Sequence, residues 1–155
     1  MSEPLFVPKP GQIDFTHVRR APVINCLVEY NGKVLLVQRS LDMNFYPGAW
    51  NGVSGFLDMP DQTVADKAKE ELREELGLSE SSIISMHEGK VIEQESKDYD
   101  KVWIVHPVKV LVNTDQVKLD WEARQFAWVD PKDIKNYQTL PGFMPIVLEL
   151  YGKEL

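Results

Sequence analysis

Apolar residues at intervals of three and four mark an amphipathic helix between residues 63 and 77. Thr63 suits the N-cap position, and Asp66 stands three residues later, in the reciprocal position of a capping box. Gly77 is a suitable left-handed stop after the last turn. The stripe that would face the core consists of Ala65, Ala68, Leu72 and Leu76.

Other stretches are rich in β-branched and aromatic residues and predict a sheet. Asn31-Gly32 lies between two of them and is typical of a tight hairpin. A second helix is expected at 141–151, after a short helical turn at 131–134. The expected strands are 23–30, 33–38, 82–87, 90–95, 102–112 and 125–129, with a further short strand at 12–17. Residues 51–56 are expected to form a short strand or turn.

The chain has 155 residues, 43% of them hydrophobic and 26% charged, which suits one globular domain with its own core. Residues 1–20 are rich in proline and are interpreted as a segment that leads into that domain. This segment could reach a neighbouring subunit in a homodimer. No internal repeat or linker divides the rest. We therefore expect a single domain covering residues 1–155.

Charge and cysteine content narrow the function. The net charge is −7 with a pI near 5.0, which argues against a protein that coats a nucleic acid polymer. No apolar run approaches the length of a membrane span, and no secretory signal pattern is present. Cys26 is the only cysteine, so no disulfide can form within the chain. A cytoplasmic protein without a membrane partner is the expectation.

Three carboxylates crowd the end of the 63–77 helix. Glu71 and Glu75 lie one turn apart beside the apolar stripe, and Glu74 stands next to them. Like charges at this spacing repel by roughly a few tenths of a kcal/mol, and the helix dipole favours cations in the last turn. A bound Mg²⁺ or Mn²⁺ would relieve both costs, because these ions prefer carboxylate oxygens. The alternative is a solvated acidic face screened by Lys69 and Arg73.

This segment resembles the signature of the Nudix hydrolases. That box reads Gly, five residues, Glu, seven residues, then Arg-Glu-apolar-x-Glu-Glu-x-Gly-apolar. Gly55 supplies the leading glycine, and Pro47-Gly48-Ala49-Trp50 resembles the approach to the box. The right half of the box is matched without a gap by Glu71-Leu72-Arg73-Glu74-Glu75-Leu76-Gly77-Leu78.

The chain departs from the signature before the helix. The spacing from Gly55 to Glu71 is one residue longer than in the family, which indicates an insertion in the loop. The early Glu of the family falls on Gln62, or on Asp61 if the loop bulges, and the Arg falls on Glu70. In the family those two side chains usually pair as a brace between loop and helix, so the loop geometry here is in doubt.

The resemblance implies an α+β fold, an α/β/α sandwich with a mixed β-sheet between helices. It implies a Mg²⁺-dependent (or Mn²⁺-dependent) hydrolase that cleaves the pyrophosphate of a nucleoside diphosphate linked to another group. The metal ligands would be the Gly55 carbonyl and Glu71, Glu74 and Glu75. Glu122 resembles a further Glu that often lies near the metals, and either Glu74 or Glu122 would act as the base.

Two further side chains are candidates for contact with a small nucleotide-type substrate. Arg39 ends an expected strand near the box and could bind a phosphate bidentately, although a solvated charge is an equal possibility. Trp50 could stack on a base, but a tryptophan in a strand more often belongs to the core. The loops carry no pattern that identifies the substrate.

Two alternatives to a hydrolase remain open at this point. The departures at Gln62 and Glu70 would suit a binding or regulatory module that senses a nucleotide without cleaving it. Isopentenyl diphosphate isomerases share the fold but need a cysteine beside the substrate. Cys26 lies in the first expected hairpin strand and not beside Trp50, so this reading is the weaker.

Overall fold

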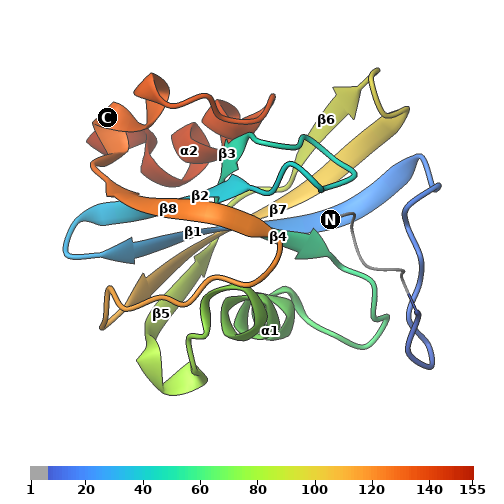
Figure 1. Ribbon diagram of the computed structural model, residues 1–155, viewed down its shortest axis with the longest axis horizontal. Helices are drawn as coiled ribbons and strands as arrows, with labels where there is room; N and C mark the ends of the chain where they lie inside the picture. The colour runs from blue at the N-terminus through green and yellow to red at the C-terminus, as the bar shows by residue number, and fades with distance from the viewer. Residues whose placement is uncertain (1–6) are drawn as a thin grey trace.

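The computed structural model describes residues 7–155 and forms one mixed sheet with helices on its two faces (Figure 1). There are two α-helices, α1 (Val64–Leu76) and α2 (Phe143–Tyr151). Short 3₁₀ helices occur at Glu80–Ser82, Pro131–Asn136 and Gly152–Glu154. The strands are β1 (Arg20–Tyr30), β2 (Lys33–Arg39), β3 (Trp50–Asn51), β4 (Val53–Phe56), β5 (Ile83–Glu88), β6 (Ile92–Ser96), β7 (Lys101–Val112) and β8 (Ala123–Val129).

The centre of the sheet is the parallel pair β1 and β7, which stay in register from Arg20–Val102 to Glu29–Leu111. On its other side β1 pairs antiparallel with β4 and, near its end, with β2. β2 continues the sheet to β3 and β8. β5 and β6 pair one after the other with β7. The expected mixed sheet is confirmed.

The β1–β2 connection is the tight hairpin expected from Asn31-Gly32. Both residues have positive φ, 52° and 78°, which a two-residue turn with matching twist requires. The β4 strand then returns beside β1 and places Gly55 opposite Ile24. This return brings the loop that precedes α1 to the centre of the sheet.

α1 begins and ends where the sequence predicts. The Thr63 side chain accepts a hydrogen bond from the Asp66 N–H, and the Asp66 carboxylate accepts one from the Thr63 N–H. Gly77 is left-handed with φ 67°. The helix packs on one face of the sheet and α2 packs on the other (Figure 1). The residues that α1 buries include two charged ones, Lys67 and Glu71.

Each helix covers its own hydrophobic core, and β1 contributes alternate residues to the two. Beneath α1 lie Ile24, Cys26 and Val28 with Ala68, Leu72 and Leu76. Beneath α2 lie Leu27, Val34 and Leu36 with Phe143, Ile146, Val147 and Tyr151. Both faces of the central strand are therefore fixed by packing.

The strand expected at 12–17 is wrong. This segment runs as turns along the edge of the α1 side, where the Ile13 N–H donates to the Asp58 carbonyl (2.8 Å) and the Gln12 amide donates to the Asp58 carboxylate (2.7 Å). Residues 1–6 of the expected lead-in lie outside the described residues. Between residues 7 and 155, no helix is long and apolar enough to cross a membrane.

Candidate active site

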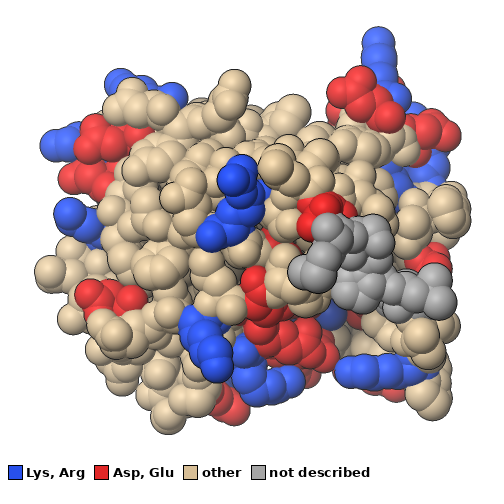
Figure 2. Space-filling model, viewed as in Figure 1, with Lys and Arg blue, Asp and Glu red and all other residues tan. Residues whose placement is uncertain are grey.

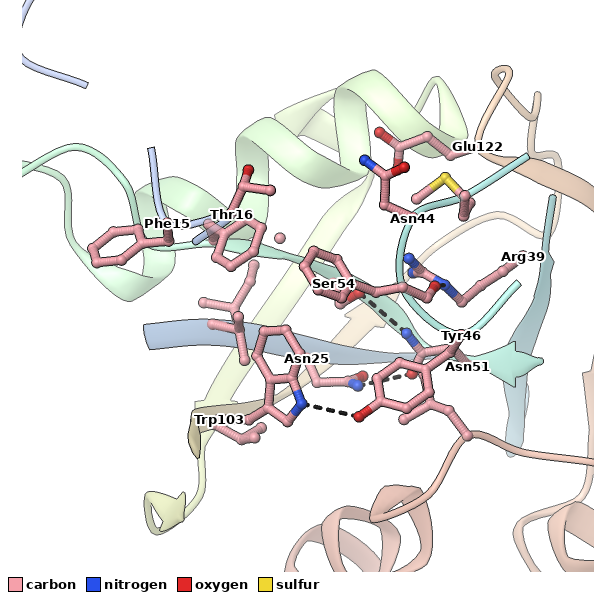
Figure 3. Close-up of a pocket in the computed structure, with 18 of the residues that line it drawn as sticks. Phe15, Thr16, Asn25, Arg39, Asn44, Tyr46, Asn51, Ser54, Trp103 and Glu122 are labelled. Atoms are coloured by element: carbon pink, nitrogen blue, oxygen red, sulfur yellow. Dashed lines mark hydrogen bonds between the residues drawn. The ribbon is translucent and has the colours of Figure 1, made fainter. Parts of the chain in front are cut away.

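A cavity of about 610 Å³ opens between the N-terminal segment, the 40–49 loop and the start of α1. Its volume is in the range of small-molecule pockets, roughly 300–1,000 Å³. Figure 3 shows Glu122 and Asn44 beside α1 at one end of the cavity, and Trp103 and Tyr46 at the other. The cavity therefore has an acidic end and an aromatic end.

Aromatic rings from separate segments meet at the aromatic end. Phe45 contacts the Trp103 ring edge to face at 5.3 Å, and Phe15 stacks on Phe56 at 6.0 Å. Tyr46 accepts a hydrogen bond from Trp103 Nε1 through its hydroxyl (3.0 Å). Such flat, rigid surfaces suit contact with a planar ligand ring.

A row of amides crosses the floor of the cavity. Asn25 Nδ2 donates to Asn51 Oδ1 (2.8 Å), and Asn51 Nδ2 donates to Ser54 Oγ (3.1 Å) (Figure 3). Gly52 has to be a glycine, because a Cβ there would lie 2.5 Å from Asn25 Oδ1 and from the Cys26 carbonyl. The packing thus fixes both amides beneath the rings.

Glu71 reaches the acidic end from the middle of α1. Its carboxylate lies against the backbone of Gly55, where a Cβ would be 2.6 Å from Glu71 Oε1. Gly55 therefore permits the close approach of α1 and β4. The expected proximity of these two residues is present in the structure.

Lys67 is the main cation among these carboxylates. The side chain is 7% exposed, and its Nζ lies 3.1 Å from Glu71 Oε1, 3.2 Å from Glu70 Oε2 and 3.3 Å from Asp58 Oδ1. Burial on its own would lower the pKa of Lys67, but the carboxylates of Glu71 and Asp58 outweigh burial and raise that pKa. Lys67 is therefore charged.

Glu75 is hydrogen-bonded to both Glu71 and Glu122. Burial raises the pKa of Glu71 to about 7, against the opposing effect of Lys67. Burial, together with the charges of Glu122 and Glu71, raises the pKa of Glu75 well above its ordinary value. Carboxyl groups that share protons in this way are a frequent feature of catalytic sites.

The loop-to-helix brace is present in altered form. Gln62 Nε2 donates to Glu70 Oε2 (3.0 Å), so an amide and a carboxylate occupy the positions where the family pairs a Glu with an Arg. The hydrogen bond of Gln62, with the ionic attraction of Lys67, lowers the pKa of Glu70 even though burial opposes this. The longer loop is thus tied to α1 despite the two departures.

A scan against family models matches residues 18–150 to the NUDIX domain. The chain belongs to the Nudix family. It is 25% identical over 144 residues to the nucleoside triphosphatase NudI of Klebsiella pneumoniae. The aligned region covers 87% of this chain and 99% of the relative. A NudI of Escherichia coli K12 is also 25% identical, over 77% of this chain and 89% of its own length.

Solved structures agree with the Nudix fold. A MutT protein from Methanosarcina mazei superposes with a TM-score of 0.69 at 24% identity, over 89% of this chain and 96% of the other. The NUDIX domain of Shewanella oneidensis NrtR, solved with ADP ribose, superposes with a TM-score of 0.71 at 15% identity. The superposition covers 88% of this chain and 89% of the NrtR domain. At these identities the likeness establishes the fold alone.

The remaining sequence candidates are placed differently. Glu74 is exposed and does not line the cavity. Arg39 lines it, with Nε bonded to the Phe45 carbonyl (2.9 Å). Trp50 packs against Tyr137 at 5.1 Å in the core beneath α2 and is not a lining residue. The structure thus brings Glu71, Glu75, Glu122 and Gly55 together, whereas the roles of Glu74 and Trp50 stay predictions.

The donor set fits the hard divalent ions of the Nudix family in its chemistry. A divalent cation would neutralise carboxylates that otherwise share protons. The arrangement is not pre-formed, however: within the part of the chain that is described, no group of three His, Cys, Asp or Glu residues stands ready to hold a metal. Glu71 Oε1 is instead engaged by Lys67.

Sequence reasoning missed several residues of this Nudix site. Lys67 gave a signal, because it stands four residues before Glu71, the spacing of an ion pair on a helix. Phe15, Asn25 and Phe45 gave none, since they come from segments that only the folded sheet brings together. Trp103 is one of four tryptophans in the chain, and it alone of the four lines the cavity.

Proposed function

We propose that this Nudix protein is a hydrolase that cleaves the pyrophosphate of a nucleoside diphosphate linked to another group, with Mg²⁺ or Mn²⁺ as cofactor. One observation carries the proposal: a single cavity joins carboxylates at one end to aromatic rings at the other. The first end suits phosphates neutralised by a cation, and the second suits a planar base. The substrate would lie along the cavity.

The ion would be held by Glu71, Glu74, Glu75 and the Gly55 carbonyl. When bound, it neutralises charge on the diphosphate and activates water for attack on phosphorus. Glu122 is better placed than Glu74 to take the proton of that water, because Glu122 lines the cavity and Glu74 is exposed. Both of the bases that the sequence left open thus keep a role, one as ligand and one as base.

Substrate recognition would use the opposite walls of the cavity. Arg39 would bind a phosphate through its guanidinium, whose Nε is already fixed on the Phe45 carbonyl. Phe45 and Trp103 would contact the base, above the amides of Asn25 and Asn51. The NudI relatives, described as nucleoside triphosphatases, and the NrtR domain solved with ADP ribose support a nucleotide-type ligand.

The test is phosphate release from a panel of ADP-ribose, dinucleoside polyphosphates, nucleoside triphosphates, nucleotide sugars and coenzyme A, with Mg²⁺ or Mn²⁺. We expect one class to turn over, and Glu75→Gln to reduce kcat by about two to three orders of magnitude, the scale for removing a group that stabilises developing charge. Glu80→Gln, on the exposed turn after α1, is the control and should match the wild type. Near-wild-type turnover by Glu75→Gln would refute the mechanism.

A nucleotide-binding module without catalysis is the second candidate, and it is favoured by the engagement of Glu71 with Lys67. Calorimetry would then give tight nucleotide binding, independent of Mg²⁺, and no product would form. The isomerase alternative lacks support, because Cys26 is fully buried beneath α1 and does not line the cavity. Burial also raises the pKa of its thiol well above the ordinary value.

A further inference from the structure

Lys67 lies among the carboxylates of the site, but the proposed hydrolysis gives it no role. Its Nζ lies within 3.3 Å of three separate carboxylates, and the side chain is only 7% exposed. Burying an ammonium group costs several kcal/mol unless charged partners compensate for the lost hydration. The Lys67 ammonium is buried and lines the cavity. A contribution to helix stability alone does not explain this position.

The partners of Lys67 come from two elements. Asp58 belongs to the loop that contains the insertion, whereas Glu70 and Glu71 belong to α1. Glu70 itself stands where the family has a cationic Arg. Lys67, one turn earlier on the same helix, therefore returns a positive charge to the junction between loop and helix.

The same contact affects the predicted metal ligand. Lys67 holds Glu71 Oε1 on the side where the carboxylate meets Gly55. A divalent ion that binds Glu71 encounters this resident positive charge at close range. Like charges at such short range repel one another, so a divalent ion binds Glu71 more weakly beside Lys67 than it would without it.

We infer that Lys67 is a built-in counter-ion of the carboxylate cluster: it positions Glu71, keeps the cluster folded without metal, and weakens the binding of divalent ions there. This inference rests on the proposed function only in requiring that the cluster binds a divalent ion. Lys67 is a positioning residue, since it acts through Glu71. The expected consequence is a site that fills only at high metal concentration.

The experiment is a calorimetric titration of the full chain with Mn²⁺, combined with melting curves in EDTA and in Mn²⁺. In Lys67→Met we expect Mn²⁺ to bind at least about tenfold more tightly than in the wild type. The variant should also melt below the wild type in EDTA and gain more from Mn²⁺ than the wild type does. Metal binding and melting are both read without any substrate.

Two variants serve as matched controls. Lys69→Met removes the same charge from the same helix, but Lys69 pairs with the exposed Glu80 at 3.0 Å, so its Mn²⁺ affinity should stay within about twofold of the wild type. Lys67→Arg keeps the charge and should restore weak Mn²⁺ binding. An affinity in Lys67→Met that equals or falls below that of the wild type would overturn the inference.

Failure of this inference can be told apart from failure of the proposed function. A wild type that binds no Mn²⁺ at any accessible concentration would refute both, whereas Mn²⁺ binding that Lys67→Met leaves unchanged would refute the counter-ion alone. If Lys67→Met does not fold even with Mn²⁺, the ammonium ¹⁵N resonance of Lys67 in the wild type decides. It should shift on saturation with Mg²⁺, and a resonance that does not move would overturn the inference.

Discussion

Glu71 is held on three sides by groups of different chemistry. Lys67 contacts one oxygen, Gly55 leaves room for the carboxylate against β4, and Glu75 shares a hydrogen bond with it. Burial raises the pKa of Glu71 to about 7, so in the metal-free protein this group changes charge near neutrality. The protonation of a single residue is thereby coupled to folding and, in the proposed function, to metal binding.

The first residue-scale prediction concerns stability and pH in EDTA. The folded-state pKa of Glu71 lies above the unfolded value of about 4.5, so the folded protein binds more protons between those values. The contribution of Glu71 to stability is therefore fully present below about pH 4.5 and is lost as the pH rises through about 7. The melting temperature should drop by several degrees between pH 5 and pH 8.

Glu71→Gln is the variant that isolates this contribution. Its melting temperature, measured relative to the wild type by calorimetry, should rise between pH 5 and pH 8, because the amide has no proton to lose. A difference between the two proteins that stays constant over this range would contradict the shift in pKa.

Lys67 also illustrates what the sequence could not supply at this scale. Its spacing from Glu71 was visible, but its burial depends on the loop bearing Asp58, which the sequence leaves open because of the insertion. The sequence analysis named Lys69 and Arg73 as the cations that could screen the helix, and neither lines the cavity. Only Lys67 points into the cavity, as the sheet beneath α1 determines.

At the scale of elements, the N-terminal segment is fastened to the sheet by one buried cation. Lys101, 2% exposed at the start of β7, donates hydrogen bonds to the carbonyls of Phe15 and Val18. Phe15 and Thr16 form a wall of the cavity. The wall therefore depends on a side chain that does not itself line the cavity.

Lys101→Met should release this wall. The loss of two hydrogen bonds between the Lys101 ammonium and partly buried carbonyls costs about 1–3 kcal/mol, and the substrate loses contacts that it makes equally in the ground and transition states. We expect KM to rise about tenfold while kcat changes by less than about twofold, measured by steady-state kinetics on the substrate found in the panel. Lys33→Met, at the exposed β1–β2 turn, is the control; a fall in kcat alone would contradict this role.

Elements defined by local chemistry were predictable, and those defined by distant partners were not. The caps at Thr63 and Gly77 and the turn at Asn31-Gly32 carry their own hydrogen-bonding or φ requirement, and all are confirmed. The segment 12–17 has an extended pattern, but its hydrogen-bond partner is Asp58, in a loop and not a strand. Its structure depends on a contact with a residue more than forty positions away.

For the whole molecule, the important quantity is a net charge of −7 around a site that would receive phosphates. Figure 2 shows acidic side chains gathered over α1, with basic ones around them. Such a field repels an anionic substrate at distances beyond about 10 Å unless salt screens it. The domain expected at 1–155 and the possible homodimer stay predictions at this scale.

Ionic strength should therefore favour the proposed reaction. We expect kcat/KM to rise several-fold when added monovalent salt increases the ionic strength from about 10 mM to about 150 mM at a fixed Mg²⁺ concentration, because screening removes long-range repulsion. Glu88→Lys, an exposed change outside the cavity, should weaken this dependence. A rate that falls with salt in both proteins would show that local cations dominate.

The parallel pairing of β1 with β7 has a consequence for the order of folding. It joins residues about eighty positions apart in the chain, and contacts across such loops form slowly because the ends must first find each other. Glu122 is positioned still later, by β8 pairing with β2. A ribosome-bound chain that has exposed α1 but not yet β8 thus carries the signature helix without an assembled site. Any activity should appear all at once, after β8 has left the ribosome and paired with β2.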